Sequence, residues 1–496
     1  MGPSGIVTGG VVTIGGTGMT GRVAVIGGGL AGITAALCCA DAGCQVTLFE
    51  ARPQLGGLTH SFRRGELRVD NGQHVFLRCC TSYLALLDRL GVADRVELQP
   101  RLAIPILTPG ADQTVWLRRT GLPAPLHLAG SLLGYRPLSM VERARFALAA
   151  VALRRVDPAS PATDEQNFGT WLRRHGQTDR AIAALWELVG VATLNSRADG
   201  AALSLAATVF QEGLLTDATA VDIGWSRVPL RQLHGDPALE CLAAAGAQVR
   251  TAAAVRRIQP GEGWEVVTDD ARVTADQVIL AVPPPAAEQL LPAGCVKLPT
   301  GWSQRLGSAP IVNVHVVLDR QVLDKPFIAG VDTPVQWVFD RTSHSGLGSG
   351  GLASGQYLAV SLSAADDYID MPTAALREKF LPELAALLPE IRAAGVRDFF
   401  VTRERHATFR PAPGTAALRP PAVTAARGLF LAGAYTATGW PATMEGAVRS
   451  GEAAATALLS TTQPPTWRHN GVKRTSKTPT WLHVGRRSDV AKGAAS

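Results

Sequence analysis

The sequence predicts an α/β fold in which a parallel sheet is assembled from distant parts of the chain and a second, mixed α+β domain is inserted between them. The first observation is a strand, a glycine turn, a helix and a second strand in succession from Val23 to Glu50. Two later segments, residues 272–283 and 428–451, contain apolar strands that end at a proline or a glycine. Residues 101–235 are mostly helical in pattern, which indicates a separate domain.

A glycine-rich pattern, G-x-G-x-x-G, occurs twice near the N-terminus, beginning at Gly16 and at Gly27. The pattern binds a dinucleotide only where its third glycine opens a helix, because free N–H groups at the helix N-terminus hold the diphosphate. After Gly21 the chain continues directly into an apolar strand, so the first copy is predicted to be part of a flexible leader, residues 1–21. After Gly32 an apolar helix follows. The predicted dinucleotide site is therefore the second copy, which consists of Gly27, Gly29 and Gly32.

An acidic residue follows the second glycine pattern at the distance expected for ribose recognition. Glu50 ends the second strand and stands 18 residues after Gly32, and an acid about 20 residues past the glycines accepts hydrogen bonds from ribose hydroxyls. The stretch ARPQLGG comes next. Its Gly56 and Gly57 offer backbone that can approach a ligand closely, and Arg52 is a further candidate contact.

These assignments divide the chain into two domains and two tails. The nucleotide-binding domain is predicted to comprise residues 22–100, 236–300 and 401–460, the substrate domain 101–235 and 301–400, and the tails 1–21 and 461–496. Residues 246–258 and 272–283 are each expected to be a strand of the nucleotide-binding sheet. Residues 428–451 are expected to form a strand, a glycine turn and a helix that opens near Pro441.

The net charge of +7 is concentrated near the C-terminus, where residues 461–496 contain seven Lys or Arg and one Asp. The rest of the chain is nearly neutral, so we expect no nucleic-acid partner. The basic tail is expected to be solvated and disordered, with weak contact to an anionic membrane as the alternative. The seven cysteines fit neither a disulfide framework nor a zinc spacing. Reduced thiols in the cytoplasm are therefore expected, and no metal site is predicted.

A predicted helix after Ser139 is a second candidate for membrane contact. Ser139 and Glu142 have the spacing of a capping box ahead of VERARFALAAVALRR. One face of this helix contains Val141, Ala144, Leu148 and Val151, and it is rimmed by Arg143, Arg145, Arg154 and Arg155. We expect this face to pack against the protein body, with a peripheral position in a membrane interface as the alternative. The uncharged residues 23–40 are not expected to span a membrane, because three glycines interrupt them.

Two blocks of the sequence resemble the FAD-dependent amine oxidase and carotenoid desaturase superfamily. They are VAVIGGGLAG…GCQVTLFEARPQLGG near the N-terminus and LAGAYTATGWPATMEGAVRSG near the C-terminus. Together with DNGQH at residues 70–74 and GWSRVPLRQLHGDPALECL, the C-terminal block is similar to the squalene-associated branch, the hydroxysqualene dehydroxylases. The likeness covers most of residues 22–460. It implies FAD as the cofactor and a Rossmann-like FAD-binding domain of the glutathione-reductase and amine-oxidase type.

The resemblance also implies which residues contact FAD. It assigns the diphosphate to Gly27, Gly29 and Gly32, the ribose to Glu50, and the adenine to the backbone of Val255. The ribityl chain and flavin ring are assigned to Gly433, Thr443, Met444 and Glu445, with Arg52, Gly56 and Gly57 as further cofactor contacts. Two positions depart from the family pattern: Leu58 stands where members often have Arg, and Ala434 where many have Asp.

The reaction implied by the resemblance is reductive dehydroxylation of hydroxysqualene to squalene, in squalene and hopanoid biosynthesis. Hydride from reduced FAD replaces an allylic hydroxyl of an apolar C30 isoprenoid, and the sequence does not identify the reductant partner of FAD. Hydroxide leaves poorly unless it is protonated, so a general acid worth about 10²- to 10⁴-fold is expected. His74, in DNGQH, is the first candidate, and its alternative is that Asp70, Asn71 and His74 only hydrogen bond to one another and to a turn. Asp222 is the second, and its alternative is a solvent-exposed loop acid.

Three other functions remain open from the sequence. A carotenoid or phytoene desaturase would use the same fold on a similarly apolar substrate, with hydride moving toward oxidised FAD. An amine oxidase is less favoured, because the chain has only five Tyr and no Cys after Cys295 for a thioether link to the flavin. A non-catalytic lipid-binding flavoprotein is the alternative outside the enzymes.

Overall fold

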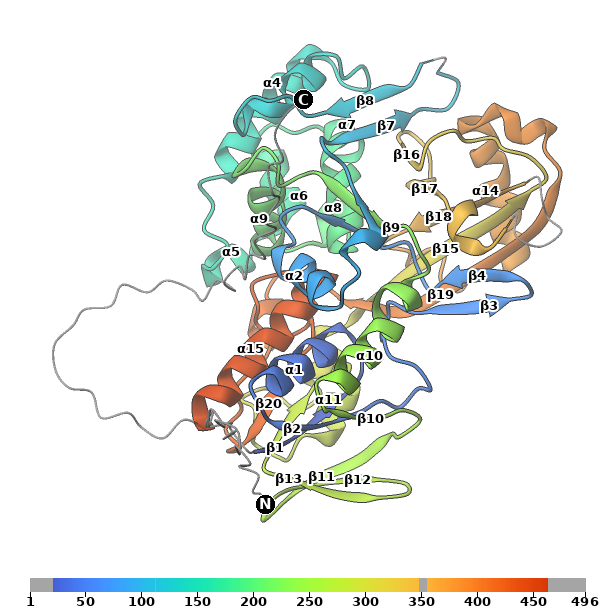
Figure 1. Cartoon of the computed structure of the whole chain (residues 1–496). Helices are drawn as coiled ribbons and strands as arrows, with labels where there is room; N and C mark the ends of the chain where they lie inside the picture. The colour runs from blue at the N-terminus through green and yellow to red at the C-terminus, as the bar shows by residue number, and fades with distance from the viewer. Residues whose placement is uncertain (1–20, 112, 348–354, 463–496) are drawn as a thin grey trace, which may run out of the picture. The chain divides into compact units, whose positions relative to one another are not determined.

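The nucleotide-binding part of the chain is a five-stranded parallel sheet (Figure 1). The computed structural model describes residues 21–111, 113–347 and 355–462, so the predicted leader up to residue 20 and the basic tail from residue 463 lie outside the described residues. The strands lie in the order β10 (Gln248–Arg250), β2 (Gln45–Phe49), β1 (Arg22–Ile26), β14 (Gln277–Leu280) and β20 (Leu429–Leu431), and all neighbouring pairs are parallel. The predicted α/β class and the discontinuous sheet are confirmed.

Three helices of this part pack together. They are α1 (Leu30–Asp41), α10 (Asp236–Ala244) and α15 (Met444–Thr462), and α1 lies between the other two in Figure 1. Small residues allow α15 to approach α1 very closely, since a Cβ atom at Gly451 would lie 2.3 Å from the carbonyl oxygen of Ala31. The C-terminal segment is thereby fixed against the first turn of α1.

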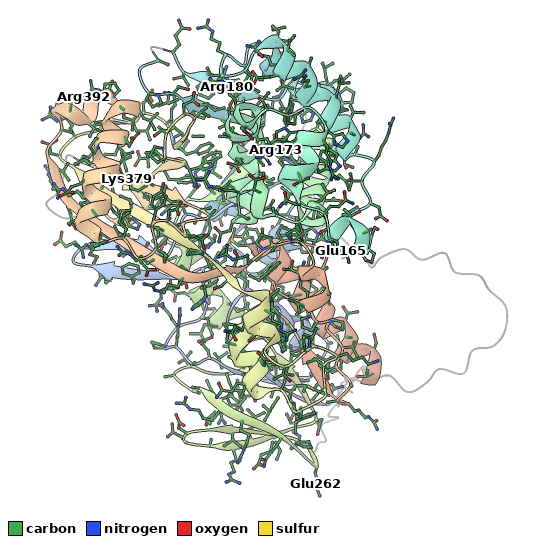
Figure 2. All side chains as sticks on the ribbon, turned by 180° about the vertical axis from the view of Figure 1, so that it is seen from behind. Glu165, Arg173, Arg180, Glu262, Lys379 and Arg392 are labelled. Atoms are coloured by element: carbon green, nitrogen blue, oxygen red, sulfur yellow. The ribbon has the colours of Figure 1, made fainter. Side chains whose placement is uncertain are left out.

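Two segments predicted as single strands divide between two sheets, so that part of the prediction is wrong. Residues 246–258 form β10 and the start of β11 (Val255–Gly261), because the chain turns at Ala252, which has a φ of 53°. Residues 272–283 form β13 (Arg272–Ala275) and then β14. With β12 (Gly263–Thr268), β11 and β13 make a separate antiparallel sheet. Glu262 lies at the tip of the β11–β12 hairpin, away from the helical region that contains Arg173 (Figure 2).

The second domain is built on a seven-stranded, mostly antiparallel sheet. Its order is β19 (Val396–Phe409), β15 (Ser308–Leu318), β18 (Gln356–Leu362), β17 (Trp337–Asp340), β16 (Phe327–Gly330), β7 (Ala103–Leu107) and β8 (Val115–Arg118). Helix α14 (Thr373–Leu387) packs its Leu376 and Phe380 in one core cluster with the buried valines of β15. The predicted domain boundary at residue 401 falls inside β19.

The prediction that residues 101–235 are mostly helical is right for residues 129–210, most of which form short helices. It is wrong for β7, β8 and β9 (Ile223–Ser226), which are strands in sheets with distant parts of the chain. The helices are α3 (Ala129–Leu133), α4 (Met140–Leu153), α5 (Pro161–Asp164), α6 (Phe168–Arg174), α7 (Asp179–Ala181), α8 (Glu187–Leu194) and α9 (Leu203–Phe210). The aromatic rings of Phe146, Phe168, Trp186 and Phe210 pack together and join α4, α6 and α9.

Among the described residues, four further α-helices and five further strands lie outside the two large sheets and the helical segment. The helices are α2 (Thr81–Arg89), α11 (Pro284–Leu290), α12 (Trp302–Leu306) and α13 (Thr342–Ser345). The strands are β3 (Ser61–Arg64), β4 (Leu67–Asp70), β5 (Val75–Leu77), β6 (Val96–Leu98) and β9 (Ile223–Ser226). Strands β5 and β6 pair with opposite edges of β9, so a segment predicted in the substrate domain completes a sheet with two segments predicted in the nucleotide-binding domain.

The capping box predicted for α4 is confirmed, but the predicted inner face of this helix is wrong. The Ser139 side chain accepts from the Glu142 backbone N–H, and the Glu142 side chain accepts from the Ser139 N–H. The residues predicted to pack inward are exposed, with Leu148 at 71%. The buried face instead contains Phe146, Ala149, Ala150 and Leu153. Both faces of α4 are apolar, so the periodicity alone did not decide between them.

The close contact between α1 and α15 predicts the effect of a single methyl group. Gly451→Ala adds helix propensity worth about 1 kcal/mol, but its Cβ would collide with the Ala31 backbone. We expect overpacking to dominate, with a net loss of about 1–2 kcal/mol in the free energy of unfolding, measured by urea denaturation.

A matched control is Gly190→Ala in α8, where the nearest neighbouring atom, on Phe210, would lie 3.9 Å from the new Cβ. This variant should keep or raise stability. A Gly451→Ala protein as stable as the Gly190→Ala protein would contradict the proposed close contact.

Candidate FAD-binding and active site

The glycine turn between β1 and α1 forms a tight backbone cradle. Gly27 has a φ of 110°, a conformation that favours glycine, and its N–H donates to the Phe49 carbonyl oxygen at 2.7 Å. A Cβ at Gly32 would lie only 1.8 Å from the Gly27 carbonyl oxygen. A Cβ at Gly29, in contrast, would point into open space, with Gly57 Cα the nearest atom at 3.8 Å. The first and third glycines therefore allow the turn to fold, and Gly29 leaves it open to a ligand.

The N-terminus of α1 fits an anionic diphosphate. Gly29 is the N-cap residue and no side chain caps the helix. The first turn is buried and contains no acidic residue. Uncapped N–H groups and the partial positive charge of the helix end together favour a bound anion. Gly56 and Gly57 border the same turn, since the Gly56 N–H donates to the Gly28 carbonyl at 2.8 Å.

Glu50 lies directly beside the glycine turn. Its buried carboxylate accepts hydrogen bonds from the N–H groups of Gly28 at 2.7 Å and Arg52 at 2.8 Å. Its backbone carbonyl accepts from the Ala253 N–H at 2.9 Å, which brings the start of β11 to this edge of the sheet. The structure therefore brings the predicted glycines together with Glu50, Arg52 and the segment that leads into Val255.

The C-terminal segment returns to the same region. Strand β20 pairs with β14, and Gly433 follows it with a φ of 136°, donating its N–H to the Ser450 hydroxyl at 2.8 Å. Helix α15 begins at Met444 rather than near Pro441, because the Thr443 hydroxyl accepts from the Gly446 N–H and caps the helix. Through the contact of Gly451 with Ala31 described above, Gly433, Thr443 and Met444 belong to the segment that lies against the start of α1.

The side chain of Glu445 is engaged by protein groups. Its carboxylate is 1% exposed and accepts from the backbone N–H groups of Ser82 and Tyr83 and from Arg449. It thus caps α2 and joins that helix to α15. The contacts of Glu445 in the structure are those of a residue that positions two helices.

A buried arginine that the sequence did not single out holds the loop before α15 in place. The Arg419 guanidinium donates to the carbonyl oxygens of Tyr435, Thr436 and Trp440 and lies over the ring of Phe409. Burial lowers its pKa to about 10, so the group remains charged at neutral pH. No acidic partner is needed, because several carbonyl dipoles surround the cation. Arg419 lies within ALRPP, which carries no motif that could have revealed this role.

The DNGQH segment lies between β4 and β5, and its Asp70 anchors the two domains. The buried Asp70 carboxylate accepts from Ser61, from the Leu230 N–H and, at 2.7 Å, from the buried guanidinium of Arg341. Arg341 follows β17 of the substrate domain. The ion pair therefore fixes the segment before His74 relative to the seven-stranded sheet.

His74 does not bond to the polar side chains of DNGQH. Its Nδ1 donates to the Gly72 carbonyl oxygen at 3.2 Å, which leaves Nε2 free to gain or release a proton. Burial lowers the pKa of His74 below 6.5, and the hydrogen bond to Gly72 partly opposes this shift. The nearby His60 donates in the same way to the Gly57 carbonyl at 2.9 Å, and burial also lowers its pKa. His60 thus links the Gly57 carbonyl to DNGQH, because the His60 backbone carbonyl accepts from the Asn71 N–H at 2.9 Å.

Asp222 is fully buried, so the alternative of an exposed loop acid is wrong. Its carboxylate accepts from Arg119 and Arg78 and from the Leu102 N–H. Burial alone would raise its pKa, but the hydrogen bonds from the two arginines lower it overall. A carboxylate kept ionised with both oxygens occupied is poorly suited to donate a proton. Asp222 instead joins β7, β8 and the segment before β9.

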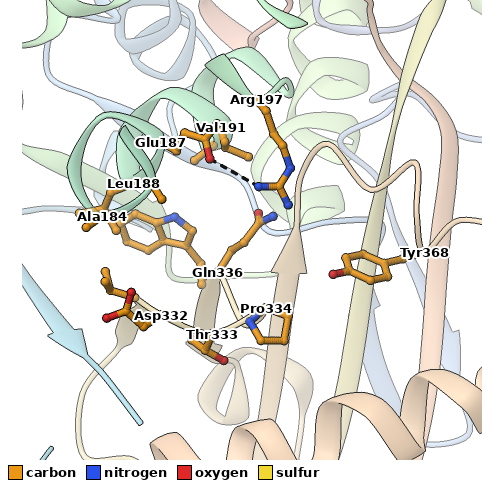
Figure 3. A pocket seen from close by; sticks show the side chains of 15 residues that line it. Ala184, Glu187, Leu188, Val191, Arg197, Asp332, Thr333, Pro334, Gln336 and Tyr368 are labelled. Carbon is orange, nitrogen blue, oxygen red and sulfur yellow. Dashed lines mark hydrogen bonds and ion pairs between the residues drawn. The ribbon is translucent and has the colours of Figure 1, made fainter. Parts of the chain in front are cut away.

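A separate cavity of about 190 Å³ lies in the substrate domain, between α8 and the β16–β17 hairpin. Figure 3 shows Glu187 and Arg197 paired on one side of it and Tyr368 on another, and the two charged groups are 3.5 Å apart. None of the residues predicted to bind the cofactor lines this cavity. Its volume is below the roughly 300–1,000 Å³ of typical ligand sites, so a C30 chain would not fit in it as it stands.

The fold and the cradle are those of a flavin-dependent oxidoreductase. The family model for flavin-containing amine oxidoreductases matches residues 30–459, and the chain belongs to this family. Its cofactor is accordingly FAD, and it is an FAD-dependent oxidoreductase. The open turn at Gly29 and the uncapped α1 N-terminus fit the FAD diphosphate.

Among curated proteins, the chain is 30% identical over 457 residues to a hydroxysqualene dehydroxylase of Sinorhizobium fredii, covering 89% of this chain and 99% of the relative. A hydroxysqualene dehydroxylase of Rhodopseudomonas palustris is also 30% identical, with the same coverage. A probable zeta-carotene desaturase of Synechococcus elongatus is 26% identical over 88% of this chain and 98% of its own length. The structure is similar to that of putrescine oxidase, with a TM-score of 0.65, 20% identity and coverage of 89% and 99% of the two chains.

The cradle predicts that Gly29→Ala weakens FAD binding without harming the fold. Gly29 has a φ of −77°, which alanine adopts freely, and the added methyl group meets no protein atom closer than 3.8 Å. The methyl group would instead occupy space needed by the diphosphate. We expect the FAD affinity to fall at least about tenfold, or ~1.4 kcal/mol, in titrations of apoprotein followed by flavin fluorescence.

Gly261→Ala is the control, since this glycine has open space and lies on the β11–β12 hairpin. It should leave both FAD affinity and unfolding temperature unchanged. If the Gly29→Ala protein binds FAD as tightly as the wild type, the diphosphate does not bind at this turn.

Proposed function

We propose that this chain is a hydroxysqualene dehydroxylase that converts hydroxysqualene to squalene. The observation that carries the proposal is the full-length similarity, at 30% identity, to two proteins of that name. When bound in its reduced form, FAD supplies the hydride that replaces the allylic hydroxyl. The C–O bond breaks, a C–H bond forms, and the hydroxyl leaves with one proton as water.

Packed aromatic side chains join the segment of His74 to the substrate domain. Trp225 pairs with Val75, the residue after His74, in the β5–β9 sheet. Its ring packs on Phe327 at 5.4 Å, and Phe327 packs on Trp337 at 5.9 Å. Trp337 lines the cavity of Figure 3. These rings form a continuous packed layer between the segment of His74 and that cavity, which also has charged lining residues such as Glu187 and Arg197.

His74 is the residue that we propose as the proton donor. Asp70 and Arg341 hold its segment rigidly, and the Gly72 carbonyl fixes the ring through Nδ1. A proton on Nε2 is then the one available for transfer to the leaving hydroxyl. Because the pKa of His74 is lowered, the imidazolium is a stronger acid than usual, but it is populated mainly at lower pH.

A zeta-carotene desaturase is the second candidate function, favoured by the similarity to the Synechococcus protein. The two reactions move hydride in opposite directions. Hydroxysqualene requires reduced FAD, whereas a desaturase removes hydrogen from its polyene and requires oxidised FAD.

The substrate assay separates the two candidates. Holoenzyme reduced with dithionite under anaerobic conditions should convert hydroxysqualene to squalene, detected by gas chromatography and mass spectrometry. Oxidised holoenzyme should leave zeta-carotene unchanged. Desaturation of zeta-carotene by the oxidised enzyme, with hydroxysqualene untouched by the reduced enzyme, would replace the proposal with the second candidate.

The role of His74 predicts a pH dependence. In the wild type, the rate of a single turnover should rise as the pH falls from 8 toward the lowered pKa of His74, because the protonated donor becomes populated. His74→Ala should lower this rate by about 10²- to 10⁴-fold and abolish the pH dependence, while the FAD content remains unchanged. The exposed His406 provides the control, and His406→Ala should behave as wild type. A His74→Ala enzyme with the wild-type pH profile would assign the proton to another group.

A further inference from the structure

Large apolar side chains are exposed mainly in one stretch of the substrate domain. Of the twelve exposed large hydrophobic residues in the described part of the chain, seven lie within residues 122–151. We refer to these seven as the apolar patch: Leu122, Leu126, Leu133, Met140, Val141, Leu148 and Val151. Monomeric proteins rarely expose such a concentration of apolar surface without using it for an interaction.

The part of the patch on α4 forms one outward stripe. Met140, Leu148 and Val151 are 61%, 71% and 43% exposed, and their spacing places them on one side of the helix. The opposite side anchors α4 through Phe146, whose ring packs 4.6 Å from that of Trp186. The stripe therefore contributes nothing to the core, although its side chains are as apolar as those of the buried face.

Contacts between α3 and α4 join the rest of the patch to this stripe. The Arg143 guanidinium in α4 hydrogen bonds to the carbonyl oxygens of Leu133 and Leu138. It also contacts the sulfur of Met140. Leu126 lies in the turn that leads directly into α3. Arg143 thus ties the end of α3, at Leu133, to the start of α4, at Met140, and its charged end is directed to backbone oxygens.

Exposed arginines border the patch. Arg145 and Arg154 lie on the two edges of the α4 stripe, and Arg155 follows the end of the helix. In the described part of the chain, none of the three has an acidic partner within ion-pair distance. The acidic residue within α4, Glu142, is occupied by Ser139 and Thr178. The patch therefore combines apolar side chains with unpaired positive charge.

We propose that the apolar patch is a docking surface for a membrane that contains anionic lipids. Apolar side chains of an interfacial helix enter the boundary of the acyl chains while arginines at its edges bind phosphate groups. The positive rim selects an anionic lipid surface over a neutral apolar partner. Within residues 21–111, 113–347 and 355–462, none of the helices combines the length and the apolarity of a membrane span. This inference does not depend on the reaction proposed above.

Binding of the full-length holoenzyme to vesicles tests the proposal. Wild-type protein should float with vesicles of phosphatidylcholine containing about 30% phosphatidylglycerol and bind less to pure phosphatidylcholine. The double variant Val141→Gln with Leu148→Gln should lose at least about tenfold in partition coefficient. The triple variant R145Q, R154Q and R155Q should lose a similar factor on anionic vesicles only. All these positions are exposed, so circular dichroism and the unfolding temperature should not change.

Two controls separate the patch from the other apolar and basic segments of the chain. Leu239→Gln with Val423→Gln removes exposed apolar side chains outside the patch and should bind as wild type. A full-length variant with the seven Lys and Arg of residues 461–496 replaced by Gln measures the contribution of the basic tail. The proposal would be overturned if both patch variants bind anionic vesicles as well as the wild type does. It would also be overturned if the wild type does not bind anionic vesicles. A wild-type dimer that the patch variants convert to a monomer without any change in vesicle binding would overturn it as well.

Discussion

The arrangement of the whole nucleotide-binding part depends on how closely backbone can approach backbone around the first turn of α1. On one side, Gly32 contacts the Gly27 carbonyl, and on the other, Gly451 contacts the Ala31 carbonyl. Any larger side chain at these positions would push β1 or α15 away. The glycine turn, which fits the FAD diphosphate, and the C-terminal segment beside it are therefore held in place by residues that have no side chain.

Around this glycine turn, polar contacts between distant segments of the chain position the rest of the candidate active site. Glu50 fixes the glycine turn, Arg419 fixes the loop before α15, and Asp70 with Arg341 fixes the DNGQH segment to the substrate domain. Each of these groups has most of its hydrogen-bonding capacity satisfied by the protein. A fully hydrogen-bonded buried charge holds the segments around it in one position, although it adds little to the free energy of unfolding. Such rigidity suits an FAD-dependent oxidoreductase, which must hold a cofactor and a substrate in a fixed relative position.

The sequence alone predicted those parts of the site whose residues are close together in the chain. The spacing of Gly27, Gly29 and Gly32 encodes a strand, turn and helix directly, and the structure contains them. The partners of DNGQH could not be predicted, because Arg341 is 271 positions from Asp70. The burial of Asp222 could not be predicted for the same reason, since Arg78 and Arg119 reach it from 144 and 103 positions away. The orientation of α4 was missed because its two faces are equally apolar.

A crystal structure of the holoenzyme would locate the cofactor directly. The FAD diphosphate should accept hydrogen bonds from the backbone N–H groups at the start of α1, with the segment from Gly433 to Met444 against the flavin. A diphosphate bound elsewhere, with the turn at Gly29 empty, would contradict this placement of the cofactor.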